Sequence, residues 1–354
     1  MKVLFIFYTP SGGMETLNRQ RTKALQQHGI DCHLLYLEHG AGLQNIEGIR
    51  TYVMTDDISI GNLMQQEQYD ALIVTSNYYL LPRLRQMGYS KTIIFEAQGL
   101  GTKDAVPYLL FNAIPYITNQ ANALLYPKTL HLMELFAKYY PAFPHFCFHN
   151  CIDSTTFTYQ RHPTLPYPVV GWVGRADPNK NWQAMLDIFK QLVASYSGLK
   201  LWLFEDSYMG DEKEQYENAL NQPELAGHVV RWSNVPNLQM RDYYSMIGDS
   251  GGFLLSTSVT EGFGYAMVEA MCCRCPVLSS DSDGNRSFLL PGITGMMYEQ
   301  GDINQAVQAG NFLLMNPQPR EALKTQARQH IEQHFSPDAY CRNFVSMLGQ
   351  LGEF

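Results

Sequence analysis

The stretch that decides the fold is "GGFLLSTSVTEGFGYAMVEAM", residues Gly251–Met271. Its first six residues form an apolar run of strand length, and the residues from Gly264 onward have a helix-forming composition. A polar loop, Thr257–Thr260, separates the two. The stretch therefore predicts a strand that ends in a loop and turns into a helix at Gly-Phe-Gly, which is the repeating unit of parallel α/β sheets.

The same alternation of apolar strands and helical segments recurs in both halves of the chain. Continuous apolar strands indicate a parallel sheet covered by helices on both faces. We predict an α/β protein of two doubly wound, Rossmann-like domains that face each other across a cleft, with ligands outside the carboxyl ends of the strands. The predicted strands cover residues 2–8, 31–37, 71–76, 92–97, 168–174, 199–205, 228–232, 251–256 and 275–280.

A polar segment with three prolines, Asp153–Pro168, is predicted to link the two domains. The first domain is then residues 1–158, and the second is residues 166–335. The length of 354 residues suits this division, because domains usually hold ~100–200 residues each.

Composition and charge exclude several classes of protein. The net charge of −8 argues against a nucleic-acid partner, which needs a basic surface. Charge does not indicate peripheral membrane contact either, although a local basic patch stays open. The opening "MKVLFIFY" is predicted to be a buried first strand rather than a leader. No stretch approaches the ~18–20 apolar residues of a membrane span, so we expect a cytoplasmic protein.

Three of the seven cysteines cluster in "CCRCPV", at Cys272, Cys273 and Cys275. A zinc site would need a second pair of Cys or His residues at metal-binding spacing, and the sequence offers none. We therefore expect these cysteines to be small packing residues in a reducing compartment.

Two glutamates flank the start of the predicted helix. Glu261 precedes the glycine turn, and Glu269 lies about 7–8 Å along the helix axis from Gly264. Between the two carboxylates, the helix N–H groups and the helix dipole favour an anion. An anion with hydroxyls at both ends describes a nucleotide-diphosphate sugar. The alternative is that Glu261 complements the dipole and Glu269 is a solvated helix residue.

A second loop, in "VGRADPNKNWQAM" from Val173, carries two cations after a predicted strand. Arg175 and Lys180, next to Gly174, suit a diphosphate, because arginine offers a planar fork and lysine a point charge. The alternative is a loop with ordinary surface charges. Gly12-Gly13, after the first strand, can also present backbone N–H groups to a phosphate, although a lone glycine pair is a weak signal.

Six motifs follow one another along the chain: Gly12-Gly13, "FHNCID", "VGRADPNKN", "TEGFGYAMVEAM", "CPVLSSDSDGNRSFL" and "PGITGMMYEQGD". Their order resembles that of retaining glycosyltransferases of the GT-B fold, similar to glycosyltransferase family 4. The last helix, residues 336–354, resembles the one that crosses back onto the first domain in that family.

The resemblance implies a role for each matching residue. Arg175 and Lys180 would grip the diphosphate, and Glu261 would contact the transferred sugar. Glu269 would hold the ribose, and Val235 would lie near the base. The backbone contacts would come from Gly262, Phe263 and Gly264 to the sugar, from Tyr265 and Ala266 to the phosphates, and from Gly13 to the β-phosphate.

The chain also departs from the family. Many members carry a histidine facing the sugar after the strand that matches residues 92–95, whereas this chain has Glu96. Glu96 either replaces that histidine in touching sugar or acceptor, or is structural. Cys151 and "CRCPV" stand where small residues are usual, and Ser287 stands near the usual position of a glutamate. These changes bear on sugar and acceptor identity more than on the fold.

We therefore expect a retaining transferase that needs no metal ion or other cofactor. Its donor would be a nucleotide-diphosphate sugar, and a UDP-sugar is the commonest donor of such proteins. Its acceptor would be a hydroxyl on a glycan, a lipid-linked glycan or a small molecule, in cell-envelope or glycoconjugate biosynthesis. The alternatives are a sugar-nucleotide epimerase of the same architecture and an inactive sugar-nucleotide-binding protein. "DSD" at Asp281–Asp283 has the letters of a metal motif, but it follows a strand where the family has a glycine-rich turn.

Overall fold

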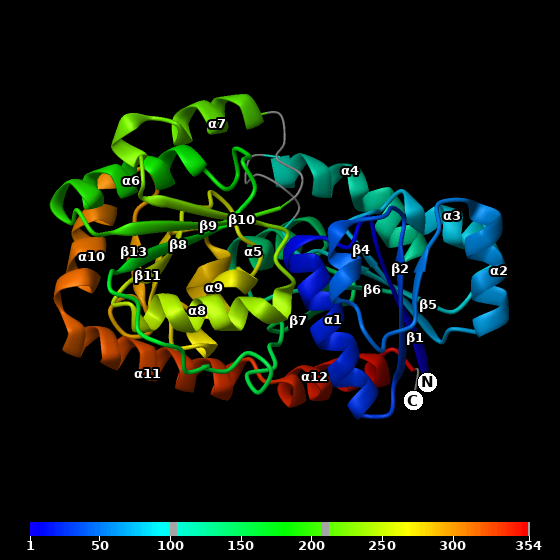
Figure 1. The fold of residues 1–354 in the computed structure, drawn as a ribbon. Coiled ribbons are helices and arrows are strands. Elements are labelled where there is room, and N and C mark those ends of the chain that lie inside the picture. Colours follow the sequence, from blue (N-terminus) through cyan, green and yellow to red (C-terminus); the bar gives the residue numbers. More distant parts are fainter. Residues whose placement is uncertain (100–104, 207–211, 353–354) are drawn as a thin grey trace. The chain divides into compact units, whose positions relative to one another are not determined.

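The computed structural model describes residues 1–99, 105–206 and 212–352. The chain divides into two compact units. Unit 1 is Met1–Ile152 together with the chain from Phe335 onward, and unit 2 is Asp153–His334. Each unit is a parallel sheet with helices packed against it (Figure 1). The predicted α/β class with two Rossmann-like sheets is therefore confirmed.

Unit 1 is a seven-stranded sheet in the order β3-β2-β1-β4-β5-β6-β7. Successive residues of β1 alternate between two cores: Leu4 and Ile6 pack under α2 to α5, whereas Val3 and Phe5 pack under α1 and α12. The strands are β1 (Lys2–Phe7), β2 (Asp31–Tyr36), β3 (Thr51–Val53), β4 (Ala71–Thr75), β5 (Thr92–Glu96), β6 (Ala123–Tyr126) and β7 (His145–Cys147). The helices are α1 (Gly12–Gln27), α2 (Asp57–Glu67), α3 (Leu80–Gln86), α4 (Ala105–Gln120), α5 (Leu130–Tyr139) and α12 (Pro337–Gln350).

Unit 2 is a six-stranded sheet in the order β10-β9-β8-β11-β12-β13. On β8, Val170 and Trp172 join the core under α6 and α10, while Gly171 faces α8, where a Cβ would meet Ile247 at 2.6 Å. The strands are β8 (Val169–Gly174), β9 (Lys200–Glu205), β10 (Val229–Ser233), β11 (Phe253–Ser256), β12 (Val277–Ser280) and β13 (Met296–Tyr298). The helices are α6 (Trp182–Ser195), α7 (Lys213–Leu220), α8 (Met240–Asp249), α9 (Tyr265–Cys272), α10 (Ile303–Met315) and α11 (Pro317–His334).

Each sheet reverses its strand order once. In unit 1 the reversal lies between β1 and β4, and in unit 2 it lies between β8 and β11. At such a topological switch point the loops that follow the two strands lead to helices on opposite faces, so a crevice opens outside the carboxyl ends. Each unit therefore has one place where the fold favours a ligand.

The sequence analysis did not predict four of the strands, β3, β6, β7 and β13. Each is only three or four residues long, and the residues of β3 and β7 are not fully buried. A run that short carries no readable period, and partial exposure removes the apolar signal. These strands form because their neighbours in the sheet offer them hydrogen bonds.

The predicted linker is not a free connection. The division between units falls after Ile152, so Asp153 and the residues that follow belong to unit 2. Tyr159 donates a hydrogen bond from Oη to Asp249 Oδ2 at 2.7 Å, and the Gln160 N–H donates to Ser245 Oγ at 3.0 Å. The residues of the predicted linker are irregular, as their polar composition with prolines indicated, but the hydrogen bonds of Tyr159 and Gln160 attach the segment to α8.

The last helix belongs to unit 1 and packs beside α1 (Figure 1). Phe344 of α12 is buried, with its ring 5.9 Å from that of Phe5 in β1. The chain end that was predicted to return to the first domain is thus part of that domain's core, although residues 353–354 lie outside the described residues. Among the described residues, no helix has the length and apolarity to cross a membrane.

Candidate active site

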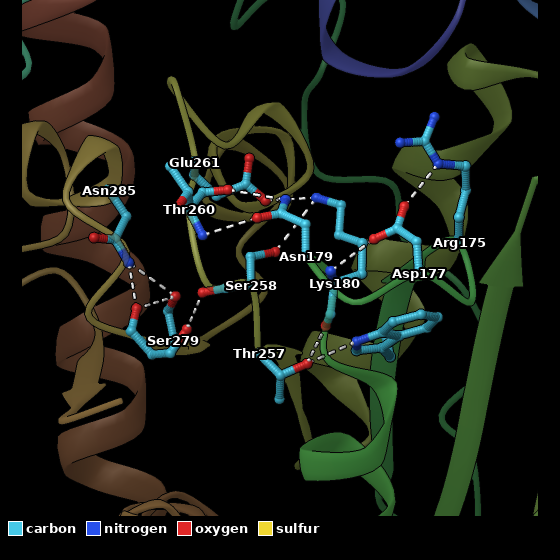
Figure 2. Close-up of polar contacts among 12 residues, drawn as sticks. Arg175, Asp177, Asn179, Lys180, Thr257, Ser258, Thr260, Glu261, Ser279 and Asn285 are labelled. Carbon is cyan, nitrogen blue, oxygen red and sulfur yellow. Dashed lines mark hydrogen bonds and ion pairs between the residues drawn. The ribbon is translucent and has the colours of Figure 1, made fainter. Parts of the chain in front are cut away.

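Two loops meet at the switch point of unit 2 (Figure 2). The loop after β8 carries Asn179, whose side chain donates to Thr260 O and accepts from Thr260 N, both at 3.1 Å. The Lys180 carbonyl accepts a hydrogen bond from Thr257 Oγ1 at 2.7 Å. Because these bonds join the loop after β8 to the loop after β11, side chains on the two loops are held in register with each other.

Lys180 and Glu261 form an ion pair at the centre of these loops. Lys180 Nζ lies 2.5 Å from Glu261 Oε1 and 3.4 Å from Ser258 Oγ. The Lys180 side chain is 26% exposed and that of Glu261 is 15% exposed, so a ligand can still reach both. The sequence analysis selected both residues from separate motifs, and the fold brings them into contact.

Arg175 stands apart from this pair. Its Nε donates to Asp177 Oδ2 at 3.0 Å, and the side chain is 45% exposed. The other oxygen of Asp177 accepts from the Lys180 backbone N–H at 2.8 Å, so Asp177 fixes the loop beneath both cations. Gly174 ends β8, where a Cβ would come within 2.9 Å of the Trp172 ring.

Helix α9 begins at Tyr265, one residue after the predicted start. Gly264 precedes it with φ +79°, a left-handed conformation that favours glycine. Phe263 is buried, with its ring 4.9 Å from Tyr265 and 5.7 Å from Phe288. The Phe263 side chain therefore anchors the turn, and Ala266 lies in the first turn of the helix.

Glu269 is 2% exposed, so the alternative of a solvated helix residue is wrong. One of its oxygens accepts from Asn237 Nδ2 at 3.0 Å, and the other accepts from Tyr244 Oη at 3.3 Å. Burial, followed by the charge of Glu269, raises the pKa of Tyr244 well above its usual value. Asn237 follows Val235 by two residues, so Glu269 lies beside the loop that the resemblance places near the base. Sequence analysis missed Asn237 and Tyr244, since no local pattern marks either.

Comparison with known proteins shows what the chain is similar to. Residues 159–330 match the model of the family described as "Glycosyl transferases group 1". Over this segment the chain is similar to the group 1 glycosyl transferases. The fold is the GT-B fold that the motifs predicted.

Several solved structures cover this chain almost completely. Sucrose-phosphate synthase from Thermosynechococcus elongatus superposes with a TM-score of 0.82 at 18% identity, covering 99% of both chains. HepE from Anabaena, solved in complex with UDP-glucose, also has a TM-score of 0.82, at 15% identity over 99% of this chain and 100% of its own. At these identities the likeness is one of fold.

The matches with curated relatives extend along about half of this chain. A poly(glycerol-phosphate) alpha-glucosyltransferase of Bacillus subtilis is 34% identical over 184 residues, 51% of this chain and 26% of its own length. A trehalose synthase of Pyrococcus horikoshii is 23% identical over 187 residues, 52% of this chain and 44% of its own. The chain therefore spans less than half the length of these two relatives.

The Gly12-Gly13 pair lies in unit 1. Gly12 is the first residue of α1 and has φ +53°, a left-handed conformation that favours glycine. Gly13 follows it inside the first turn. Ser11 occupies the capping position of α1 without a hydrogen bond from its side chain to the helix. Both glycines thus stand at the start of a helix that follows β1, at the switch point of unit 1.

Glu96, where the resemblance led us to expect a histidine, is fully buried. It pairs with Arg21 Nη1 at 2.5 Å, and it accepts from Thr75 Oγ1 at 2.6 Å and from Gln98 Nε2 at 2.9 Å. Arg21 is also fully buried, with its guanidinium 4.0 Å from the centre of the Phe5 ring. Of the two roles left open by the sequence, this network favours the structural one, because the carboxylate has no exposed surface.

The "DSD" triplet is part of the turn that backs Glu261. Asp281 accepts from Arg286 Nε at 2.7 Å, and Asp283 forms a parallel bridge with Glu261. Asp283 has φ +66° and ψ −63°, the strained centre of a γ-turn, in which the Gly284 N–H donates to Ser282 O at 2.8 Å. Among the described residues, no three or more His, Cys, Asp or Glu side chains group to hold a metal ion.

The clustered cysteines are core residues, as predicted. Cys272, Cys273 and Cys275 are at most 1% exposed. Burial raises the pKa of the Cys275 thiol to about 12, so it stays protonated and unreactive near neutral pH. Cys272 is the last residue of α9, which packs against α8 and α11.

Proposed function

We propose that this chain is a glycosyltransferase that moves a sugar from a nucleotide-diphosphate sugar to an acceptor hydroxyl, with retention of anomeric configuration. UDP-sugars are the first donors to test, since HepE was solved with UDP and with UDP-glucose. The transfer would need no metal ion, because cationic side chains and the α9 dipole would carry the charge stabilisation.

The observation that carries this proposal is the contact between Lys180 and Glu261 at the switch point of unit 2. In a nucleotide-diphosphate sugar, the sugar hydroxyls adjoin the β-phosphate. A carboxylate and an ammonium held 2.5 Å apart match that neighbourhood: Glu261 would accept from sugar hydroxyls while Lys180 donates to phosphate oxygens. Both side chains are partly exposed, so the ligand can replace part of the pair's mutual contact.

The start of α9 supplies the second support. Backbone N–H groups would be offered to the sugar by Gly262, Phe263 and Gly264. The diphosphate would receive those of Tyr265 and Ala266. Glu269, held by Asn237 and Tyr244, would accept from the ribose hydroxyls. Val235 would lie near the base, in the loop before Asn237.

The transfer would proceed as follows. The bond between the anomeric carbon and the β-phosphate oxygen breaks, and its electron pair leaves with the phosphate. Lys180, Arg175 and the α9 dipole stabilise the negative charge that develops there. The acceptor oxygen bonds to the anomeric carbon from the face that the phosphate leaves. The acceptor proton passes to the departing phosphate, so no protein base is required.

A thermal-shift screen against UDP-, GDP-, ADP- and dTDP-sugars tests the donor. A ligand that binds only the native state at 100 times its Kd stabilises the protein by ~2.7 kcal/mol. We expect one nucleotide to raise Tm, and its sugar donor to release nucleoside diphosphate when an acceptor is added. If no nucleotide raises Tm, the donor site is wrong. If the donor binds and only an epimerised sugar nucleotide forms, the reaction class is wrong.

A further inference from the structure

Unit 1 contains a cavity of about 500 Å³ beside α2, which we call the α2 groove. One wall is the exposed side of α2, with Asn62, Gln65 and Gln68, and the other is the turn after α3, with Ser90 (Figure 1). Its end at Lys91 directly precedes β5, so it lies at the amino end of that strand, whereas the switch point lies at the carboxyl ends. The volume is typical of a ligand pocket, and the proposed transfer does not use it.

Two buried tyrosines line the floor of the α2 groove. Tyr69 is 1% exposed and Tyr89 is 8% exposed. Their hydroxyls are engaged inside the unit: Tyr69 Oη lies 2.7 Å from His33 Nδ1, and Tyr89 Oη donates to Tyr69 O at 3.3 Å. These tyrosines therefore offer the groove ring surface rather than hydroxyls, and Met64 and Met87 add apolar surface beside them.

The charged groups that line the α2 groove are already paired. Asp57 accepts from Arg83 Nε at 3.0 Å, and Lys91 Nζ lies 2.8 Å from Asp70 Oδ1. The charges within each pair compensate one another, so a phosphate would find no unpaired cation in the described lining. What remains for a ligand on the walls is a set of uncharged amide and hydroxyl groups.

Two residues of the groove oppose the local preference of α2. Gly61 lies in the helix interior, where alanine is more stable. A Cβ there would meet only Met87 among the described residues, at 3.7 Å, so packing does not require glycine. Gln68 ends the helix at φ +54°, where glycine is usual. The glycine leaves the groove open and the glutamine supplies an amide, and such local conflicts are expected at functional sites.

Uncharged amides above an apolar floor match a carbohydrate. Amides both donate and accept hydrogen bonds, as sugar hydroxyls do, and the C–H face of a pyranose packs on ring surface. A peptide would favour a free sheet edge or a row of apolar pockets. The strands at this end of the groove, β4 and β5, each have a neighbour on both sides, and the walls are mostly polar.

We propose that the α2 groove binds an uncharged glycan outside the site of transfer. The choice of a carbohydrate rests on the proposed transferase function, which brings the protein into contact with glycans. The groove holds sugars of a chain rather than the donor or the reacting hydroxyl. Glycan binding there should therefore be the same with and without UDP.

The test is glycan binding by the full chain, measured with and without UDP. An array of neutral, cationic and acidic oligosaccharides identifies the ligand, and saturation-transfer NMR measures its affinity. Gly61→Leu fills the groove, and we expect it to weaken binding about tenfold or more. Its Tm should not fall, because leucine is the better helix former. Gln65→Ala removes one amide and should weaken binding about 2–10-fold.

Gln66→Ala is the matched control. Gln66 is an exposed amide of the same helix, but it is not among the residues that line the α2 groove, so its loss should leave binding unchanged. Gly61→Ala adds only a Cβ, for which there is room, and should bind more tightly than Gly61→Leu. The thermal shift with UDP should equal that of wild type in all variants, which shows that they fold and keep the donor site.

Each outcome decides a different question. If no neutral glycan binds, or if Gly61→Leu binds it as well as wild type, the α2 groove is not a carbohydrate site. If glycan binding requires UDP, the glycan is held at the site of transfer and the inference is wrong. It is also wrong if Gly61→Leu abolishes binding of a library peptide instead. If UDP and its sugars give no thermal shift while glycan binding still depends on Gly61 and Gln65, the proposed function fails and the carbohydrate site stands.

Discussion

The two switch points have the same topology and opposite chemistry. In unit 2 the charged side chains at the switch point reach the surface: Lys180 and Glu261 pair there, and both remain partly exposed. In unit 1 the pair of opposite charges is Arg21 with Glu96, which has no exposed surface, and the exposed residues after β1 and β4 include Tyr8 and Tyr79. The comparison indicates that strand order determines where a ligand can bind, whereas the burial of the charged side chains determines which kind of ligand binds there.

The largest expected effect breaks the buried pair of unit 1. Arg21→Ala leaves Glu96 buried without its partner charge, so we expect the free energy of unfolding to fall by about 3–5 kcal/mol. Urea denaturation of the purified chain measures this loss. Arg83→Ala is the matched control, because Arg83 pairs with Asp57 at the surface, where an ion pair contributes about 0–1 kcal/mol.

Equal losses for Arg21→Ala and Arg83→Ala would contradict a structural role for the buried pair. Glu96→Gln sharpens the point, since glutamine keeps the size and the acceptor oxygen of glutamate. If Glu96 touched the sugar or the acceptor, Glu96→Gln would lower the turnover of the donor-bound enzyme. The free energy of unfolding would then stay constant. We expect the opposite result: Glu96→Gln lowers the free energy of unfolding, and the molecules that stay folded keep their turnover.

The next effect concerns the exposed pair of unit 2. Lys180→Ala removes a cation aimed at the departing phosphate, and we expect turnover to fall on the order of 10²-fold or more. Lys190→Ala, in α6, serves as control, because its side chain reaches Gln222 at the surface. Steady-state release of nucleoside diphosphate measures both. A fully active Lys180→Ala variant would take lysine out of the mechanism.

A smaller effect separates the two glutamates of the opening motif. Glu269→Gln should weaken free nucleoside diphosphate roughly 10–150-fold, because a hydrogen bond to a charged group contributes ~1.5–3 kcal/mol and ribose is present in that ligand. Glu261→Gln should leave this affinity nearly unchanged and lower turnover with the sugar donor. Calorimetric titration beside steady-state rates measures both, and equal effects on nucleotide affinity would mean that the carboxylates do not divide the donor.

The smallest effect concerns the strained turn behind Glu261. Asp283→Gly relieves a positive φ that costs about 1–3 kcal/mol, offset by the greater chain entropy of glycine, so we expect unit 2 to gain about 1 kcal/mol. Gly284→Ala should act in the opposite direction, because its Cβ would lie 2.1 Å from the Glu261 carbonyl oxygen. Thermal denaturation measures both. Destabilisation by Asp283→Gly would show that the Asp283 side chain matters more than its backbone strain.

The parts of the site that could be predicted are those with a local signature. The positive φ of Gly264 favours glycine, and a glycine before a helix is visible in the sequence. Lys180 and Glu261 each follow a buried strand, so their place at a sheet edge could be inferred without the fold. Asn237 and Tyr244 could not be found in this way, since their role depends on contact with Glu269 from another element.

What the sequence by itself determined is the alternation of strands and helices, the ends of the long strands and the residue types placed there. These depend on the period of apolar residues and on backbone sterics, which act within a few positions. Only the tertiary structure decided which strands are neighbours. That order joins Lys180 to Glu261 across 81 positions and buries Glu96 against Arg21 across 75. Contacts at such distances depend on the packing of whole sheets, which no local pattern specifies.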